Sequence, residues 1–114
     1  MDSKDYKVLG KILEHIEAII EETKEIEDAE SFRNNNDKSK AALFDLMQIG
    51  ELAGNGLSAA AIKEMTQIPW TQIYALRNRI VHGYAKVDYA IIWETVDEDI
   101  PNLEKEIKKA LAIN

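Results

Sequence analysis

The sequence predicts an all-α protein, a compact bundle of about five helices joined mostly by short loops. Apolar residues recur every three or four positions along most of the chain, which is the period of an amphipathic helix. No stretch alternates apolar and polar residues as a half-buried strand would. The chain has 114 residues, of which 46% are apolar, so we expect one globular domain over residues 1–114.

The first half of the chain predicts two long helices. The first spans about residues 4–27 and has an apolar stripe made of Leu9, Ile12, Leu13, Ile16, Ile19 and Ile20. Residues 31–37 contain three asparagines, which favour turns, so we expect a loop there. The second helix should span about residues 38–53 and end at the Gly-Asn-Gly sequence of residues 54–56.

The second half contains clear start and stop signals for shorter helices. Ser58 is a suitable N-cap for a short third helix. Pro69 suits the first turn of a fourth helix, and Gly83 stands where a C-cap glycine would end it. Asp88 can cap a fifth helix, and Pro101 either kinks that helix or begins a sixth helical piece.

Composition excludes several classes of protein. There is no cysteine, so disulfides and thiolate chemistry are excluded and a cytoplasmic location is expected. The longest run without a charged residue, 65–76, has twelve residues, whereas a membrane-spanning helix needs roughly 20 apolar ones. The net charge of −7 argues against a general nucleic-acid coat protein. A small basic site is still compatible, because residues 77–86 contain three cations and no acid.

The most unusual stretch is RNRIVHGY, Arg77–Tyr84, at the end of the fourth expected helix. Asn78 and His82 are four residues apart, so on a helix the amide can orient the imidazole. If Gly83 ends the helix, Tyr84 folds back near the helix terminus. The polar groups would then collect at one exposed helix end.

This set of side chains suits RNA cleavage without a metal ion. His82 can take or give a proton near neutral pH, and could help deprotonate a ribose 2′-hydroxyl. Arg77 offers a fork of donors that can stabilise the charge of the phosphoryl transition state. No Asp, Glu and His cluster with metal-ligand spacing accompanies the motif, so neither a metal nor another cofactor is expected.

A single histidine cannot easily serve as both acid and base. His15 lies far away in the sequence and reads as an ordinary half-buried helix residue, so a symmetric dimer with two copies of Arg77 and His82 in one cleft is expected instead. The competing interpretation is purely structural. A histidine near a helix C-terminus interacts well with the helix dipole, and an Arg-x4-His spacing often occurs by chance.

A longer pattern resembles the HEPN superfamily, in its HepT-like branch. The matching pieces are IPW, RN, an apolar pair, HGY, a tryptophan and IPNL, which lie at residues 68–70, 77–78, 80–81, 82–84, 93 and 100–103. LMQIGELA at residues 46–53 resembles the second-helix motif of the family. The resemblance covers about residues 5–110. Each piece alone is weak, and the combination is specific.

The resemblance implies a dimerising helical bundle that acts as the toxin of a toxin–antitoxin pair and cleaves RNA, not DNA, without a metal. By position in the motif, Arg77 and His82 would be catalytic and Asn78 would support them. The implied partner is a small MntA-like nucleotidyltransferase that adds AMP to the motif tyrosine, Tyr84. An added phosphate two residues from His82 would occupy Arg77 and obstruct the RNA path.

Two hypotheses from different classes therefore follow from the sequence. The first is a metal-independent RNase toxin, which the intact Arg77, His82 and Tyr84 favour. The second is a non-catalytic helical module that binds the nucleotidyltransferase or a nucleotide, which the acidic composition favours. Trp70 and Trp93 could stack bases, but on these helices we expect them in the core or in a dimer contact.

Overall fold

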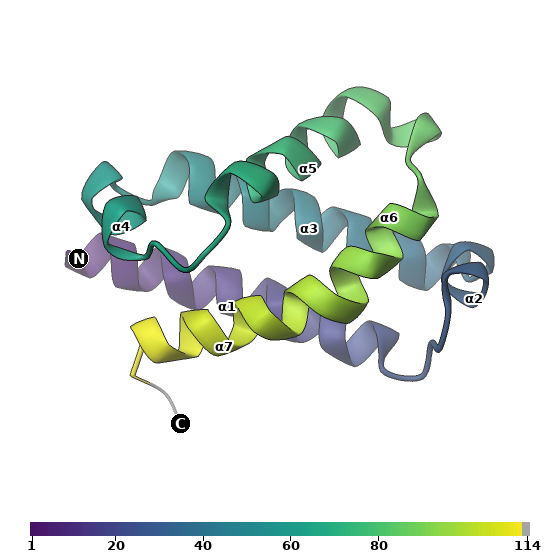
Figure 1. Cartoon of the computed structure of the whole chain (residues 1–114), viewed down its shortest axis with the longest axis horizontal. Coiled ribbons are helices and arrows are strands. Elements are labelled where there is room, and N and C mark those ends of the chain that lie inside the picture. Colours follow the sequence, from purple (N-terminus) through teal and green to yellow (C-terminus); the bar gives the residue numbers. More distant parts are fainter. Residues whose placement is uncertain (113–114) are drawn as a thin grey trace.

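The computed structural model describes residues 1–112, and every regular element in this part of the chain is helical. Two long helices form the centre, α1 (Ser3–Thr23) and α3 (Asn36–Gly56), and they pack against each other (Figure 1). α5 (Trp70–Gly83) packs on α3, whereas α7 (Ile100–Ala110) packs on α1. The predicted all-α bundle is confirmed.

Shorter helical pieces connect these four helices. They are α2 (Ala29–Asn34), α4 (Ala59–Glu64), η1 (Tyr84–Lys86), α6 (Tyr89–Glu94) and η2 (Thr95–Asp99). In Figure 1, α6, η2 and α7 form one continuous helical ribbon that crosses the bundle below α5. Within residues 1–112, none of the helices combines the length and the apolar character that crossing a membrane requires.

The core lies around α1, because its apolar stripe faces the surrounding helices. Five of the six residues expected in that stripe are buried, and Ile20 is partly buried. Other elements contribute fully buried side chains that complete the core, namely Phe32, Leu43, Ile92 and Ile107. Removal of these apolar surfaces from water is the main driving force for the packing of the helices.

Two of the expected helix starts are confirmed by their hydrogen bonds. The Ser58 hydroxyl accepts a hydrogen bond from the Ala61 N–H at 3.1 Å and caps α4. The Asp88 carboxylate accepts one from the Ala90 N–H at 2.9 Å and caps α6. Such caps satisfy backbone donors that have no partner within the helix.

The loop expected at residues 31–37 is wrong, because α2 occupies most of it. The Phe32 ring is fully buried and lies 5.5 Å from the Trp93 ring, between centroids. This long-range contact outweighs the local preference of the asparagines for a turn. Asn35 instead caps α3, since its side-chain oxygen accepts a hydrogen bond from the Lys38 N–H at 3.2 Å.

Both helices end at their predicted glycines, α3 at Gly56 and α5 at Gly83, but neither glycine is a left-handed C-cap. α3 continues to Gly56, where a Cβ atom would lie 2.9 Å from Val8 Cγ1, so this glycine permits close packing against α1. Gly83 has a φ of −144°, not the left-handed value of a C-cap glycine. The chain continues into η1, and Tyr84 keeps a helical backbone with φ −47° and ψ −44° instead of folding back.

Pro101 is the second residue of α7, directly after the π-helical turn η2, within a ribbon whose backbone stays helical from Tyr89. Proline has no backbone N–H and cannot complete a regular α-helical ladder at this point. The preceding turn, η2, is therefore widened to π-helix, and the Ile100 N–H donates to the Thr95 carbonyl five residues earlier.

A buried carboxylate links the starts of α1 and α4. Asp5 is 2% exposed, and its oxygens accept hydrogen bonds from the Ser58 N–H and the Ser58 hydroxyl, both at 2.8 Å. The Asp2 N–H donates a third hydrogen bond at 3.2 Å. The Ser58 N–H contributes most to holding the pKa of Asp5 below its ordinary value, against the opposing effect of burial.

Asp5 should make stability depend on pH in the acid range. A carboxyl whose pKa is lowered by folding stabilises the protein above its unfolded pKa, and this contribution disappears as the pH falls through the lowered folded pKa. We therefore expect Asp5→Asn to be less stable than wild type at neutral pH, with a difference in the free energy of unfolding that narrows as the pH falls below 3.8, the ordinary pKa of this carboxyl. Urea unfolding at neutral pH and at a pH below that value measures the difference, and a difference of equal size at the two would contradict the prediction.

Candidate functional site

Arg77 is positioned by the close approach of α5 to α3. A Cβ atom on Gly50 would overlap Arg77 Cβ and would lie 2.7 Å from Arg77 Cγ. The next glycine of α3, Gly54, faces the Tyr74 ring of α5 in ordinary contact at 3.6 Å. α5 therefore packs at this distance only because residue 50 has no side chain.

The Arg77 guanidinium is held by two oxygens. Nη2 donates to Glu51 Oε2 at 2.5 Å, and Nη1 donates to Asn78 Oδ1 at 2.9 Å. Nε is buried and has no hydrogen-bond partner within residues 1–112. Asn78 therefore contacts Arg77 rather than His82, contrary to the expectation from the four-residue spacing.

His82 is exposed and lines a hollow of about 440 Å³. Arg79 and Lys86 are the cations at its edge, and Asp88 is the acid that lines it. Its apolar lining consists of Leu76, Val87, Ile91 and Ile92. The hollow thus combines a proton-transfer group with two positive charges, a combination suited to a phosphodiester.

Arg77 does not line this hollow. Arg77 and His82 are five positions apart in the sequence, which places them about 140° apart around an α-helix. Arg77 lies on the side of α5 that packs on α3, and His82 lies on an exposed side. Within one protomer the two predicted catalytic side chains therefore do not line the same hollow, as the helical period already indicates.

Tyr84 lies in η1 and is 49% exposed, and Val81, three residues earlier on α5, is 43% exposed.

Both tryptophans pack within the bundle, which agrees with the core position, one of the two positions expected for them. Trp70 is buried, with its ring N–H donating to the Met65 carbonyl at 3.1 Å, and Trp93 packs against Phe32.

His15 forms a hydrogen bond with an acidic side chain within the bundle. Its Nδ1 lies 2.7 Å from Asp45 Oδ1, across the contact between α1 and α3. The His15 side chain is 26% exposed, and it does not line the hollow beside His82. The half-buried structural role expected for His15 agrees with this position.

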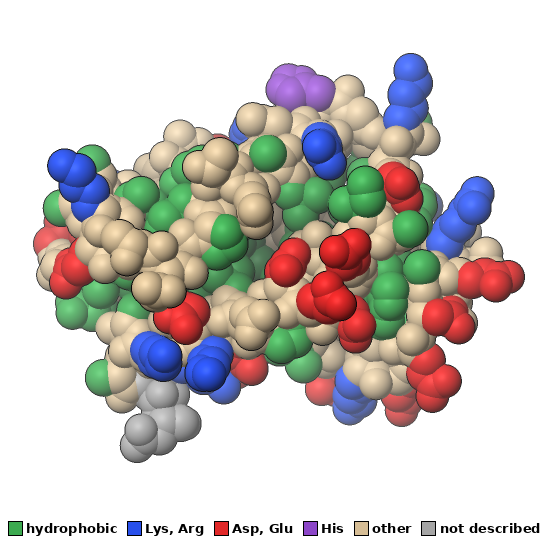
Figure 2. Space-filling view, viewed as in Figure 1, with side chains coloured by type: hydrophobic (Ala, Val, Ile, Leu, Met, Phe, Trp, Pro, Cys, Tyr) green, Lys and Arg blue, Asp and Glu red, His purple; other side chains and the backbone are tan. Residues whose placement is uncertain are grey.

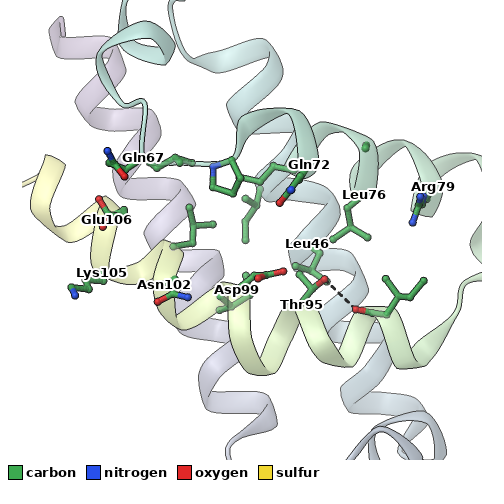
Figure 3. Close-up of a pocket in the computed structure, with 18 residues that line it drawn as sticks. Leu46, Gln67, Gln72, Leu76, Arg79, Thr95, Asp99, Asn102, Lys105 and Glu106 are labelled. Atoms are coloured by element: carbon green, nitrogen blue, oxygen red, sulfur yellow. Dashed lines mark hydrogen bonds between the residues drawn. The ribbon is translucent and has the colours of Figure 1, made fainter.

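A larger groove of about 580 Å³ separates α5 from the α6–α7 ribbon. Figure 2 shows apolar side chains gathered between these elements, and Figure 3 shows Gln72 and Arg79 on the α5 side opposite Asp99 and Asn102. The groove exists because α5 packs closely on α3 and leaves its other side open. Leu76, Arg79 and Ile91 line both spaces, so the groove continues into the hollow beside His82.

Residues 1–112 contain no group of three or more His, Asp and Glu side chains placed to hold a metal ion. Glu51, which holds the Arg77 guanidinium, was given no role in the sequence, although it lies in the LMQIGELA stretch of residues 46–53. Its partner Arg77 is 26 residues away on another helix, so no local spacing marks the pair.

The sequence matches the family described as "Ribonuclease HepT-like" over residues 12–110. It is 35% identical over 109 residues to a Methanocaldococcus jannaschii protein named "Putative RNase MJ1380", covering 95% of this chain and 98% of that protein. It is 36% identical over 106 residues to the "Probable ribonuclease HepT" of Thermococcus cleftensis, covering 93% of each chain. No solved structure matches the chain.

The helix contact that positions Arg77 can be tested with two glycine substitutions. Gly50→Ala should lower the free energy of unfolding by about 1–3 kcal/mol, because the added methyl overlaps Arg77 next to the backbone. In α1, a Cβ atom on Gly10 would meet no atom within 4 Å, so Gly10→Ala should raise the free energy of unfolding by about 0.5–1 kcal/mol. Urea unfolding followed by circular dichroism measures both values. A Gly50→Ala protein as stable as Gly10→Ala would contradict the close approach.

Proposed function

This chain belongs to the HepT-like ribonuclease family, and we propose that it is a metal-independent RNase toxin whose antitoxin is an MntA-like nucleotidyltransferase. The observation that best supports an RNA substrate is the hollow beside His82. It gathers Arg79 and Lys86 around an exposed imidazole on a protein whose net charge is −7. Because so acidic a surface repels RNA, a local basic site is where a phosphodiester would bind.

The proposed reaction is a transesterification. The ribose 2′-oxygen loses its proton to a base, for which we propose His82, and attacks the adjacent phosphorus. The bond from phosphorus to the 5′-oxygen breaks, and that oxygen takes up a proton. The products are a 2′,3′-cyclic phosphate and a 5′-hydroxyl. Arg77 stabilises the additional negative charge on the phosphoryl oxygens in the transition state, while Asn78 holds the Arg77 guanidinium.

We propose that the active form is a homodimer. Within one protomer Arg77 and His82 lie on different sides of α5, so a second copy is the simplest way to supply both to one cleft. The groove between α5 and the α6–α7 ribbon offers apolar surface for such an association. Arg79 stands on one rim and Asp99 on the other, so a two-fold arrangement could set opposite charges against each other.

Tyr84 is the proposed site of neutralisation. Its side chain is 49% exposed, two residues after His82. The tyrosine hydroxyl would attack the α-phosphorus of ATP bound to the nucleotidyltransferase and displace pyrophosphate, which leaves AMP on the tyrosine. The added phosphate and nucleoside would obstruct the RNA path by negative charge and by bulk.

RNA cleavage by the unmodified protein in excess EDTA tests the catalytic proposal. Wild type should cleave and leave 2′,3′-cyclic phosphate ends. His82→Ala and Arg77→Ala should each lose at least about a hundredfold in rate, because each removes a group that acts in the transition state. Arg33→Ala and His15→Gln serve as matched controls that change an arginine or a histidine away from the hollow. Specific activity should also fall on dilution if the active form is a dimer.

A wild type that cleaves no cellular RNA, with mass spectrometry showing a bare Tyr84, would contradict the RNase proposal. The non-catalytic binding module would then be the better explanation. The pairing of Arg77 with Glu51 and the net charge of −7 are the observations that fit that alternative.

The neutralisation site can be tested by substitution of the tyrosine alone. Tyr84→Phe should keep the fold and the cleavage activity, because it loses only the hydroxyl of a half-exposed ring. It should not gain the mass of AMP when incubated with the nucleotidyltransferase and ATP, and it should stay active. Tyr89→Phe, on α6, is the control and should still be modified. AMP found on another residue of wild type would contradict the assignment.

A further inference from the structure

The Arg77–Glu51 pair joins two helices at the point where they pack most closely. Gly50 allows α5 to approach α3, and the next residue along α3 contacts the guanidinium at 2.5 Å. One turn earlier on α5, the Tyr74 hydroxyl donates to the Ala53 carbonyl at 3.5 Å. The side chain of Arg77 therefore leaves a firmly packed backbone, and Glu51 fixes its far end.

The pair contributes little to stability. The Arg77 and Glu51 side chains are 30% and 42% exposed, and ion pairs with that much contact with water are largely offset by desolvation and by the lost freedom of the side chains. Its main effect is geometric, since a planar guanidinium with two of its edges occupied has one orientation.

The donors that remain define how Arg77 can bind a phosphate. Nε is buried within the protein and unavailable to a ligand. Nη1 and Nη2 each use one N–H, on Asn78 and Glu51, and each has one left. A phosphoryl group must therefore meet the terminal nitrogens, in the direction that Glu51 and Asn78 leave open.

We propose that Glu51 is a positioning residue for the RNase reaction, holding the Arg77 guanidinium in the orientation that stabilises the transition state. This inference rests on the proposed catalytic role of Arg77. Glu51 has two opposed effects. It orients the arginine, which favours turnover, and its negative charge lies beside the path of the phosphate, which weakens RNA binding.

These opposed effects give the role a kinetic signature. Glu51→Ala should lower kcat by about tenfold to a hundredfold, because a misplaced catalytic group costs that much. RNA affinity should stay equal or become tighter, because a negative charge is lost. Misfolding would not tighten RNA binding. Glu51→Gln keeps an acceptor oxygen for Nη2 of Arg77, so its kcat should lie between those of wild type and Glu51→Ala.

The experiment compares kcat, KM and RNA affinity for wild type, Glu51→Ala, Glu51→Gln, Arg77→Ala and the Glu51→Ala/Arg77→Ala double variant. The double variant should be no slower than Arg77→Ala, because Glu51 acts through Arg77. Glu104→Ala is the matched control. It removes the same charge from the partly exposed ion pair with Lys108, lines neither hollow, and should stay within about twofold of wild type.

The outcomes separate this inference from the proposed function. If wild type cleaves and Arg77→Ala does not, a Glu51→Ala variant with normal kcat overturns the positioning role alone. A rate loss in the double variant that exceeds the loss in Arg77→Ala overturns it as well. If wild type cleaves no RNA, the proposed function fails first and the positioning role fails with it.

Discussion

The absence of a side chain at Gly50 is the constraint on which the site depends. It sets the distance between α3 and α5, and therefore where the first residue of the motif can reach. With any larger residue there, α5 would have to move outward, and Arg77 would leave the acid beside it. The Arg77 side chain is thus positioned from α3, a helix outside the stretch from Arg77 to Tyr84.

The same contact explains the open groove. α5 is bound tightly to α3, while the α6–α7 ribbon follows α1 and α2, so the two sides of the molecule diverge (Figure 1). Apolar residues that a larger bundle would cover, such as Leu76 and Ile91, are left at the surface beside His82. Exposed apolar surface next to a reactive group is an arrangement typical of sites completed by a second chain.

The sequence predicted the helical fold and most helix starts because these depend on local signals. Apolar periodicity marked the buried stripe of α1, and Ser58 and Asp88 cap helices through neighbours three or fewer residues away. The misplaced elements depend on distant residues. α2 forms because Phe32 is buried against Trp93, and the glycine at the end of α3 has a packing role, since a side chain on Gly56 would collide with Val8.

The helical position of the stretch from Arg77 to Tyr84 was predicted, but its contacts were not. The stretch from Arg77 to Tyr84 stood out by its polar content, and the structure places Arg77–Gly83 in the second half of α5 and Tyr84 at the start of η1. Their contacts differ from those expected, because the Arg77 side chain extends toward α3, where it contacts Glu51, and Asn78 accepts a hydrogen bond from Arg77. Glu51 could not be found from the motif, since the tertiary contact alone joins it to Arg77.

The π-helical turn η2 sets the rotation of α7 about the ribbon axis relative to α6. A π-helical turn takes up one residue more than an α-helical turn, and one residue corresponds to a rotation of about 100°. Without it, α7 would be rotated relative to α6, and Leu103 and Ile107 would turn away from α1. The number of residues between Glu94 and Ile100, rather than their identity, therefore decides which side of the last helix seals the core and which side borders the groove.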